Sequence, residues 1–256
     1  MKIFDRKYIN LVRELTLFNF KLRDQGTFLG FIWTLLHPFL MLTILFMLFS
    51  KRLGRGIEHY EIYLLIGIIQ WNFLSAGTNE GLKSIINSRS VLRNVNISRI
   101  AVVLSSVLAV FISFLLELFV LGGFIVFSGL GFSPVIVLLP FVVLIQLLLV
   151  ISISLVLSCL NVYFKDAGHI WNILLKIGFF TTPIFYSIPM FISKPKMVAY
   201  FLNPMTQLMI FARQIILFKN PPALINMLFV FVAVLIILAL CYLIFKKLED
   251  GIMERL

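Results

Sequence analysis

Long uninterrupted apolar runs are the feature that most constrains how this chain can fold. Runs of about 20 apolar residues recur along it, for example at residues 29–50 and 224–245. A helix needs about 20 such residues to cross a bilayer, whereas strands of a membrane barrel alternate over about 10 residues. Hydrophobic residues make up 61% of the chain and charged residues 13%, which lies outside the range of soluble domains. The sequence therefore predicts an all-α integral membrane protein.

We expect six transmembrane helices in one domain, residues 29–245. The expected spans are residues 29–50, 62–79, 100–127, 135–160, 170–187 and 224–245. Pro38 is expected to kink the first. The second carries polar residues, Gln70, Asn72, Ser75 and Asn79, which predicts contact with other helices or with a wet path. At about 1.5 Å per residue the third is about 42 Å long, so it should tilt or extend beyond a core of about 30 Å.

The segment between the fifth and last runs, residues 188–222, is apolar but broken by prolines 189, 195, 204, 221 and 222. Its longest uninterrupted piece, residues 205–218, is too short to span a bilayer and is typical of a re-entrant or interfacial helix. Irregular backbone at membrane depth is tolerated only where protein or a water-filled cavity covers it. The segment therefore predicts re-entrant helices beside a cavity or pore, with a surface loop and one interfacial helix as the alternative.

Residues 1–28 predict a basic amphipathic helix on the cytoplasmic face. No secretory leader is expected there, because no short apolar core precedes a small-residue cleavage site. Apolar residues recur every three or four positions in one stripe: Phe4, Tyr8, Leu11, Leu15, Phe18 and Leu22. Such a helix lies flat on a membrane surface or packs on the protein's own body, and the two alternatives are compatible.

Basic residues indicate how the chain is oriented. With six spans, about twice as many lysines and arginines fall on the side of the termini as on the other side. This excess places both termini, including the tail at residues 246–256, in the cytoplasm. The same rule accounts for the net charge of +11 without nucleic-acid binding, which we do not expect.

The chemistry of an enzyme is not evident. A phosphate-binding loop needs the spacing G-x-x-x-x-G-K-[ST], and the nearest stretch, "GTNEGLKS" at residues 77–84, has Leu82 between the glycine and the lysine. The three histidines lie in separate elements, and the two cysteines lie inside apolar runs without metal-type spacing. We therefore expect no catalytic, cofactor-binding or metal-binding residues.

Ionisable and aromatic residues within the runs remain to be explained. Glu117 and Lys176 each cost about 2.5–3.5 kcal/mol at mid-bilayer on insertion scales. A structural pair, a pore-facing position and an ion-coupling role are the alternatives for them. Aromatic residues near the ends of spans suit an interfacial belt. The alternative is a stacking surface for sugar rings, to which the tetrad "QWNF" at residues 70–73 would contribute.

Four stretches in order resemble the ABC type-2 exporter permeases that move O-antigen, capsule and teichoic acid polysaccharides. They are "LGFIWTLLHPFLMLTILFMLFS", "LLIGIIQWNFLSAGTNEGLKSIINSRSVLRNVNISRIAVVLSSVL", "NVYFKDAGHIWNILLKIGFFTTPIFYS" and "LNPMTQLMIFARQIIL". The resemblance covers roughly residues 11–217. Departures are Lys165 where arginine is common, Ser98 where proline is common, and "DQGTF" at residues 24–28.

The resemblance implies a homodimer in the cytoplasmic membrane joined to two copies of a separate ATPase, which uses ATP and Mg²⁺. It implies a lipid-linked polysaccharide as substrate. It also implies that the N-terminal helix and first inner loop meet the ATPase, and that short re-entrant helices lie on the outer side. The candidate ATPase interface is Arg13, Lys83, Asn87, Arg89, Arg93 and Asp166. The candidate channel or gate is Trp33, Gln70, Trp71, Asn72, Pro183, Tyr186, Asn203 and Pro204.

Polysaccharide export is the function that these patterns favour. A type-2 exporter of a small drug or lipid is one alternative, and an ion-coupled secondary transporter without an ATPase is another. The sugar and its lipid carrier are not specified by these patterns.

Overall fold

The computed structural model describes residues 6–23, 32–54, 56–95, 97–187, 203–249 and 251–252, with Thr34 described in its main chain only. Regular structure in these residues is helical. The elements are α1 (Arg6–Arg23), α2 (Ile32–Phe49), α3 (Tyr60–Asn87), α4 (Arg89–Asn94), α5 (Arg99–Phe127), η1 (Pro134–Leu138), α6 (Leu139–Tyr163), α7 (Ala167–Thr181), α10 (Pro204–Ile216) and α11 (Leu224–Glu249).

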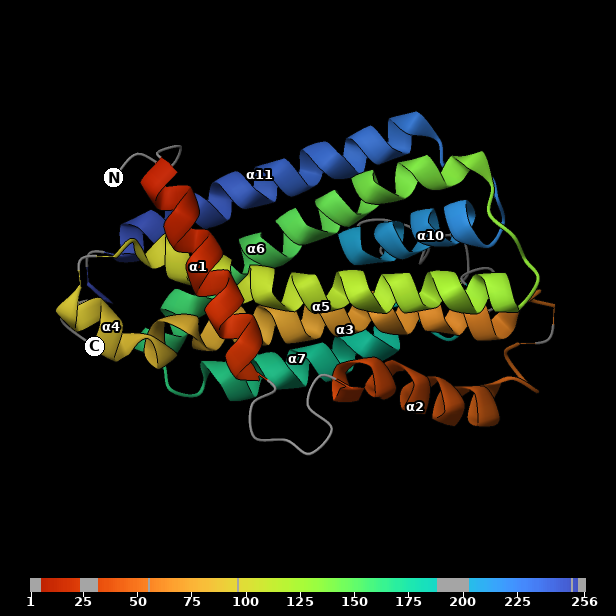
Figure 1. Cartoon of the computed structure of the whole chain (residues 1–256), viewed down its shortest axis with the longest axis horizontal. Coiled ribbons are helices and arrows are strands. Elements are labelled where there is room, and N and C mark those ends of the chain that lie inside the picture. The colour runs from red at the N-terminus through yellow and green to blue at the C-terminus, as the bar shows by residue number, and fades with distance from the viewer. Residues whose placement is uncertain are drawn as a thin grey trace.

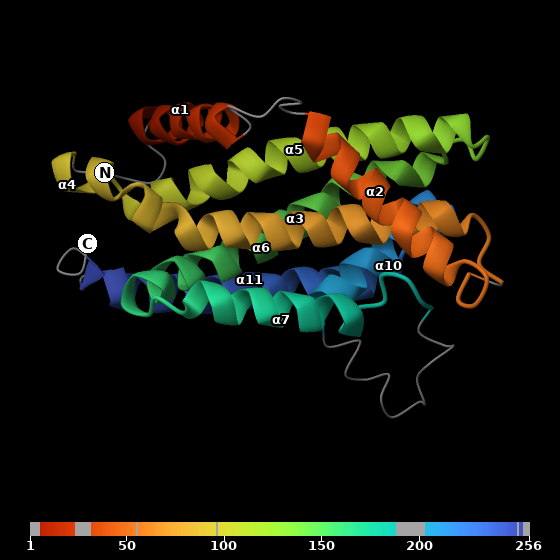
Figure 2. The ribbon, with the colours of Figure 1, turned by 90° about the horizontal axis from the view of Figure 1, so that it is seen from below.

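The long helices run side by side along one axis, while α1 lies across them (Figures 1 and 2). Helix α3 is central, because it packs against α2, α5, α6 and α7. Its Phe73 stacks on Phe114 of α5 with ring centroids 4.4 Å apart. Its Gly81 lets α6 approach closely, since a Cβ there would lie 2.4 Å from the Cβ of Ser154.

The two ends of the bundle are held by different contacts. At one end the start of α5 and the end of α11 are joined by an ion pair between Arg99 Nη1 and Glu249 Oε1, 3.0 Å apart. There Tyr163, at the end of α6, donates its hydroxyl proton to the carbonyl of Leu248. At the opposite end, α3 begins beside the segment that follows α7 and beside α10.

Three of the predicted runs have both the length and the apolarity to cross a membrane. These helices span Arg99–Phe127, Pro134–Tyr163 and Leu224–Glu249. The apolar part of α2, Leu35–Phe49, is shorter. Crossing by α2, α3 and α7, and so the total of six, stays a prediction. Helix α3 extends beyond the expected residues 62–79 at both ends, whereas α7 ends at Thr181, two residues before Pro183, which has no N–H to continue a helix.

Helix α10 lies where residues 205–218 predict a short helix. The Asn203 side chain caps it by accepting a hydrogen bond from the Met205 N–H at 3.0 Å, and Pro204 occupies its first turn. None of its residues is exposed, and it contacts α3, α6, α11 and η1. Prolines 189 and 195 of the predicted broken segment lie outside the described residues.

Helix α1 packs on α5, one of the two alternatives for it. Asn19 Nδ2 donates to the hydroxyls of Ser105 and Ser106 at 3.3 and 3.4 Å. Of the predicted stripe, Tyr8 is buried and Leu11 and Leu15 are half-buried, whereas Phe18 and Leu22 are exposed. Phe4 lies outside the described residues. Placement on a membrane surface stays a prediction.

Candidate functional site: a polar seam and a buried arginine

Helices α3 and α7 pack in antiparallel fashion through a series of contacts. Trp171 Nε1 donates to Thr78 Oγ1 at 2.9 Å. Gly178 makes room for the ring of Trp71, since a Cβ on that glycine would lie 2.7 Å from it. Gly168 faces Leu82 in the same way at 3.6 Å. These contacts define how the two helices are aligned along their axes: residue 71 lies opposite residue 178, and residue 82 lies opposite residue 168.

The residues that follow Trp71, Thr78 and Leu82 on α3 and Gly168 and Trp171 on α7 are polar, and so is Lys176, which follows buried Leu175 of α7. Each residue of an α-helix is rotated by about 100° from the one before it. When two helices pack antiparallel, the residues that directly follow their contact residues therefore point toward the same side of the helix pair. We call this set the polar seam: Asn72, Asn79 and Lys83 on α3, with His169, Asn172 and Lys176 on α7. All six are half-buried or exposed, whereas the contact residues Trp71, Thr78 and Leu82 are buried.

The seam carries positive charge and hydrogen-bonding groups. Its two lysines are accompanied by no carboxylate among the six residues. Helix α2 borders it, since Asn72 Nδ2 lies 3.4 Å from His37 Nδ1. An exposed polar strip on helices of membrane depth indicates a wet path or a protein neighbour rather than lipid.

The segment after α7 is held by Arg213 of α10. The guanidinium is buried, with 3% of the residue exposed, and donates to the carbonyls of Pro183 at 2.6 Å and Ile184 at 2.7 Å. It also donates twice to the carbonyl of Tyr63, and it lies 3.4 Å from the centroid of the Tyr63 ring. Within the described residues its protons therefore meet main-chain oxygens and an aromatic face, not a carboxylate.

Two tyrosines of α3 complete this arrangement. The hydroxyl of Tyr60 donates to the carbonyl of Phe185 at 2.6 Å, and that of Tyr63 to the carbonyl of Tyr186 at 2.8 Å. The hydroxyl of Tyr186 turns back and donates to the carbonyl of Thr181 at 2.9 Å. Four consecutive carbonyls, residues 183–186, thus accept side-chain protons, which satisfies irregular backbone inside the fold. We call these residues and their donors the carbonyl clamp.

The structure distributes the candidate channel residues over several separate places. Pro183 and Tyr186 belong to the carbonyl clamp, whereas Asn203 and Pro204 begin α10 at the end away from Arg213. Asn72 lies on the polar seam, and Trp71 is buried beneath it against α7. Gln70 is buried against α6, where its carbonyl accepts a proton from Gln146 at 2.8 Å, and Trp33 is exposed in the first turn of α2.

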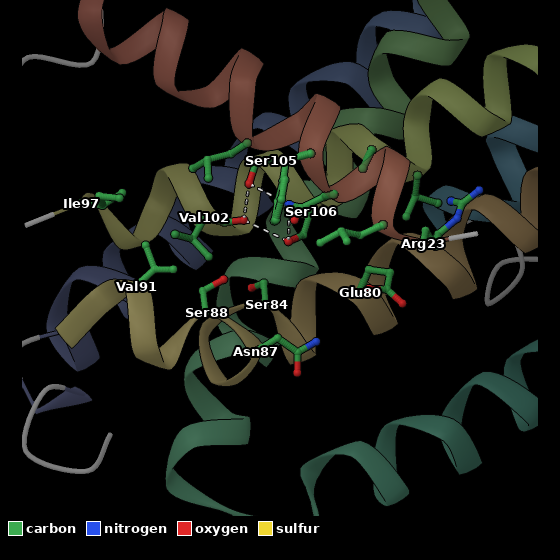
Figure 3. A pocket seen from close by; sticks show the side chains of 16 residues that line it. Arg23, Glu80, Ser84, Asn87, Ser88, Val91, Ile97, Val102, Ser105 and Ser106 are labelled. Atoms are coloured by element: carbon green, nitrogen blue, oxygen red, sulfur yellow. Dashed lines mark hydrogen bonds between the residues drawn. The ribbon is translucent and has the colours of Figure 1, made fainter. Parts of the chain in front are cut away.

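A polar cavity of about 290 Å³ lies under α1, between α3, α4 and α5 (Figure 3). Its polar lining comprises Asn19, Arg23, Glu80, Ser84, Asn87, Ser88, Ser105 and Ser106. The hydrogen bonds from Asn19 to α5 cross this space. Helix α1 is therefore held over a cavity with polar lining as well as by close packing.

A second cavity, of about 320 Å³, adjoins the first at Arg23 and Glu80. Arg23 Nη2 donates to Ser113 Oγ at 2.5 Å, and Glu117 lines the same space. Glu117 therefore shares a cavity with an arginine of α1, and the choice among the three alternatives for it stays a prediction. Its Oε2 is buried without a hydrogen bond among the described residues.

The candidate ATPase interface gathers at the end of the bundle that carries α4. Lys83 and Asn87 lie in the last turns of α3, and Arg89 and Arg93 lie on α4; all four are exposed. Exposed Asp166 lies at the same end, because neighbouring Asn161 donates to the carbonyl of Leu82 at 3.1 Å. Arg13 is exposed on α1, apart from this group.

Sequence reasoning missed the role of Arg213 and, among the seam residues, His169 and Asn172. The count of basic residues on the two sides of the membrane includes Arg213 on the side opposite the termini, and the structure buries it. Its one signal was a lone arginine in a short apolar piece between prolines. For a metal or cofactor, no group of three or more histidine, cysteine or acidic side chains converges in the described part of the chain. What the arrangement offers chemically is hydrogen bonding and positive charge along a strip.

Comparison with known proteins gives a consistent result. The family model described as "ABC-2 type transporter" matches residues 10–217. The chain is 28% identical to an O-antigen export system permease protein RfbA from Myxococcus xanthus, over 79% of this chain and 78% of that protein. It is 24% identical to a protein of the same description from Klebsiella pneumoniae, over 82% of this chain and 81% of that protein.

Proposed function

The chain belongs to the ABC-2 type transporter family, and we propose that it is the permease subunit of a transporter that exports a lipid-linked, O-antigen-like polysaccharide across the cytoplasmic membrane. ATP hydrolysis on a separate subunit would drive export. The observation that carries this proposal is the likeness, over about four fifths of each chain, to permeases named for O-antigen export.

The polar seam supports a path for a hydroxyl-rich substrate. Amide and imidazole groups such as those of Asn72, Asn172 and His169 exchange hydrogen bonds with hydroxyls and water. Lipid tails cannot satisfy these groups, so we infer that the seam faces a second copy of the chain across a shared pore. Trp71 and Phe179, whose rings meet edge to face at 6.0 Å, lie beside the seam as apolar surface for sugar rings.

The end of the bundle that carries α4 is the surface we assign to the ATPase. Exposed Arg89 and Arg93 offer charge to an acidic partner surface. Lys83 lies in the last turns of α3 and also on the polar seam. Motion of α4 and of the end of α3 would therefore be transmitted directly to the seam. Helix α1, held over its polar cavity, would move with them.

The orientation follows from the same assignment. The cytoplasmic end is the one that carries α4, the start of α5 and the end of α11, so both termini are cytoplasmic. The carbonyl clamp and α10 then lie at the outer end, as re-entrant structure near the exit. The chain would cross the membrane six times, through α2, α3, α5, α6, α7 and α11.

Two linked measurements test the proposal. The purified chain alone should hydrolyse no ATP, because ATP binding is assigned to the partner. Reconstituted with its ATPase subunit, the complex should hydrolyse ATP faster when lipid-linked glycan is added. Robust ATPase activity from the chain alone would contradict the assignment. Transport of substrate by the chain alone, driven by a proton gradient, would instead identify it as a secondary transporter.

A further inference from the structure

We propose that Lys176 is a binding site for the negatively charged groups of the substrate, at mid-depth on the polar seam. The ligand chemistry is a phosphate or a carboxylate, carried either by the lipid anchor or by an acidic sugar. This inference rests on the proposed export function and adds a specificity-determining residue to it.

Lys176 has no protein partner that would account for its charge. Its side chain is exposed on α7, and within the described residues no hydrogen bond or ion pair reaches it. Two other cations of the bundle have polar partners. Arg213 donates hydrogen bonds to carbonyls, and Arg23 donates one to Ser113 and lines a cavity together with Glu117. Lys176 is therefore a cation left available on a helix of otherwise apolar character.

The position of Lys176 along the bundle makes this exposure costly against lipid. Lys176 lies nine residues beyond Ala167, the start of α7, which is about 14 Å at 1.5 Å per residue. That is close to half of a hydrocarbon core of about 30 Å. The contact between Gly178 and Trp71 places Lys176 opposite the middle of α3, the central helix of the bundle. A charge at that depth faces water, protein or a counter-ion.

The surroundings favour an anion over a cation. Lys176 and Lys83 are the charged members of the seam, and its remaining members are three asparagines and a histidine. Glu80 and Glu117, acidic residues of α3 and α5, line a cavity that reaches the seam at Asn72, but no residue of α7 lines that cavity. Asn72 and Asn172, one helical turn or less from the level of Lys176, add amide donors for the oxygens of a phosphate or carboxylate.

A lysine binds such groups as a flexible point charge, whereas the planar guanidinium of arginine binds them through two fixed hydrogen bonds. The less rigid contact suits a ligand that is transported and must be released. In a homodimer, two copies of Lys176 would face one path and strengthen its positive potential. The expected role is to favour entry of the charged part of the substrate into the middle of the membrane, where a neutral path would exclude it.

The test measures binding of defined probes to the purified permease–ATPase complex in nanodiscs. Radiolabelled geranylgeranyl pyrophosphate represents a lipid phosphate, and tetragalacturonate represents an acidic sugar; geranylgeraniol and maltotetraose are their neutral counterparts. The variants are Lys176→Gln, which removes the charge, Lys176→Arg, which keeps it, and Lys51→Gln, which removes an exposed charge from the turn after α2.

Lys176→Gln should weaken binding of at least one anionic probe by about tenfold or more, the size of a lost charge-assisted hydrogen bond. Lys176→Arg and Lys51→Gln should bind within about twofold of the wild type, and the neutral probes should not distinguish the variants. The probe that is affected identifies the source of the anion, because the lipid phosphate and the sugar carboxylate are tested separately.

Equal binding of both anionic probes by the wild type and Lys176→Gln overturns the inference, as does a wild type that binds neither. An independent measurement is labelling of a Lys176→Cys variant in sealed membranes. A water-soluble, negatively charged thiol reagent should modify it, and lack of modification would contradict an aqueous path. Glycan-stimulated ATP hydrolysis by the wild-type complex separates the two claims: if it persists, only the role of Lys176 fails; if it is absent, the export function fails.

Discussion

Replacement of Arg213 by methionine should strongly destabilise the protein. Methionine has an unbranched side chain that fills part of the same space, but it carries no hydrogen-bond donor. The main-chain carbonyls of Tyr63, Pro183 and Ile184 would lose the hydrogen bonds that they accept from Arg213. Hydrogen bonds to a charged group contribute about 1.5–3 kcal/mol each, and Arg213 makes four. Removal of the charge also ends its desolvation penalty of several kcal/mol, so the net loss should be about 3–5 kcal/mol.

Lysine should not rescue this position. It keeps the charge, but its single ammonium cannot reach carbonyls on both sides as the guanidinium fork does, so a buried charge is left under-compensated. Arg213→Lys is therefore expected to destabilise about as much as Arg213→Met.

The assay is thermal unfolding of the purified protein in detergent, with Arg52→Met, in the exposed turn after α2, as the matched control. At about 2–4 °C per kcal/mol for a chain of this size, both Arg213 variants should unfold roughly 6–20 °C earlier than the wild type. The control should stay within about 2 °C. An Arg213→Met protein as stable as the control would refute the reasoning that the carbonyl clamp depends on this guanidinium.

Three further predictions concern packing, capping and assembly. Gly81→Ala should lower the unfolding temperature by crowding Ser154, at a cost of about 1–3 kcal/mol, and Ser154→Gly in the same chain should recover part of the loss. Asn203→Ala should cost about 1 kcal/mol through loss of the α10 cap, and Asn203→Asp should preserve stability; calorimetry of both variants checks this. Charge reversal of Arg89 and Arg93 together should abolish co-purification of the ATPase while leaving the unfolding temperature unchanged, and unaltered co-purification would move the interface elsewhere.

The apolar runs predicted most of the helices, because positions that face lipid and positions in the protein core are both occupied by apolar side chains. Helices α5, α6 and α11 lie where the runs predict them, and α10 lies where a short piece between prolines predicts one. The expected fifth span, residues 170–187, runs past the end of α7 at Thr181, because the apolar run continues beyond Pro183, which has no N–H to continue a helix. The extension of α3 to Asn87 was missed because its polar last turns end the apolar run before the helix ends.

Features that depend on which helices are neighbours could not be derived in this way. Gln70, Trp71 and Asn72 are consecutive and formed one candidate group, yet they face α6, α7 and the seam respectively, because each step turns the side chain by about 100°. His169 and Asn172 gain significance only beside α3. Arg213 appeared to be an outer charge because the oxygens it meets come from residues 63, 183 and 184, far from it in sequence.

The most direct test of the proposed function is translocation itself. The permease and its ATPase are reconstituted in liposomes loaded on one leaflet with lipid-linked glycan, and glycan accessible to a membrane-impermeant glycosidase on the other leaflet is measured with time. The account predicts that accessible glycan increases only when ATP, Mg²⁺ and both proteins are present. Glycan that crosses equally without ATP, or fails to cross while the ATPase remains active and coupled to a small drug or lipid, would contradict it.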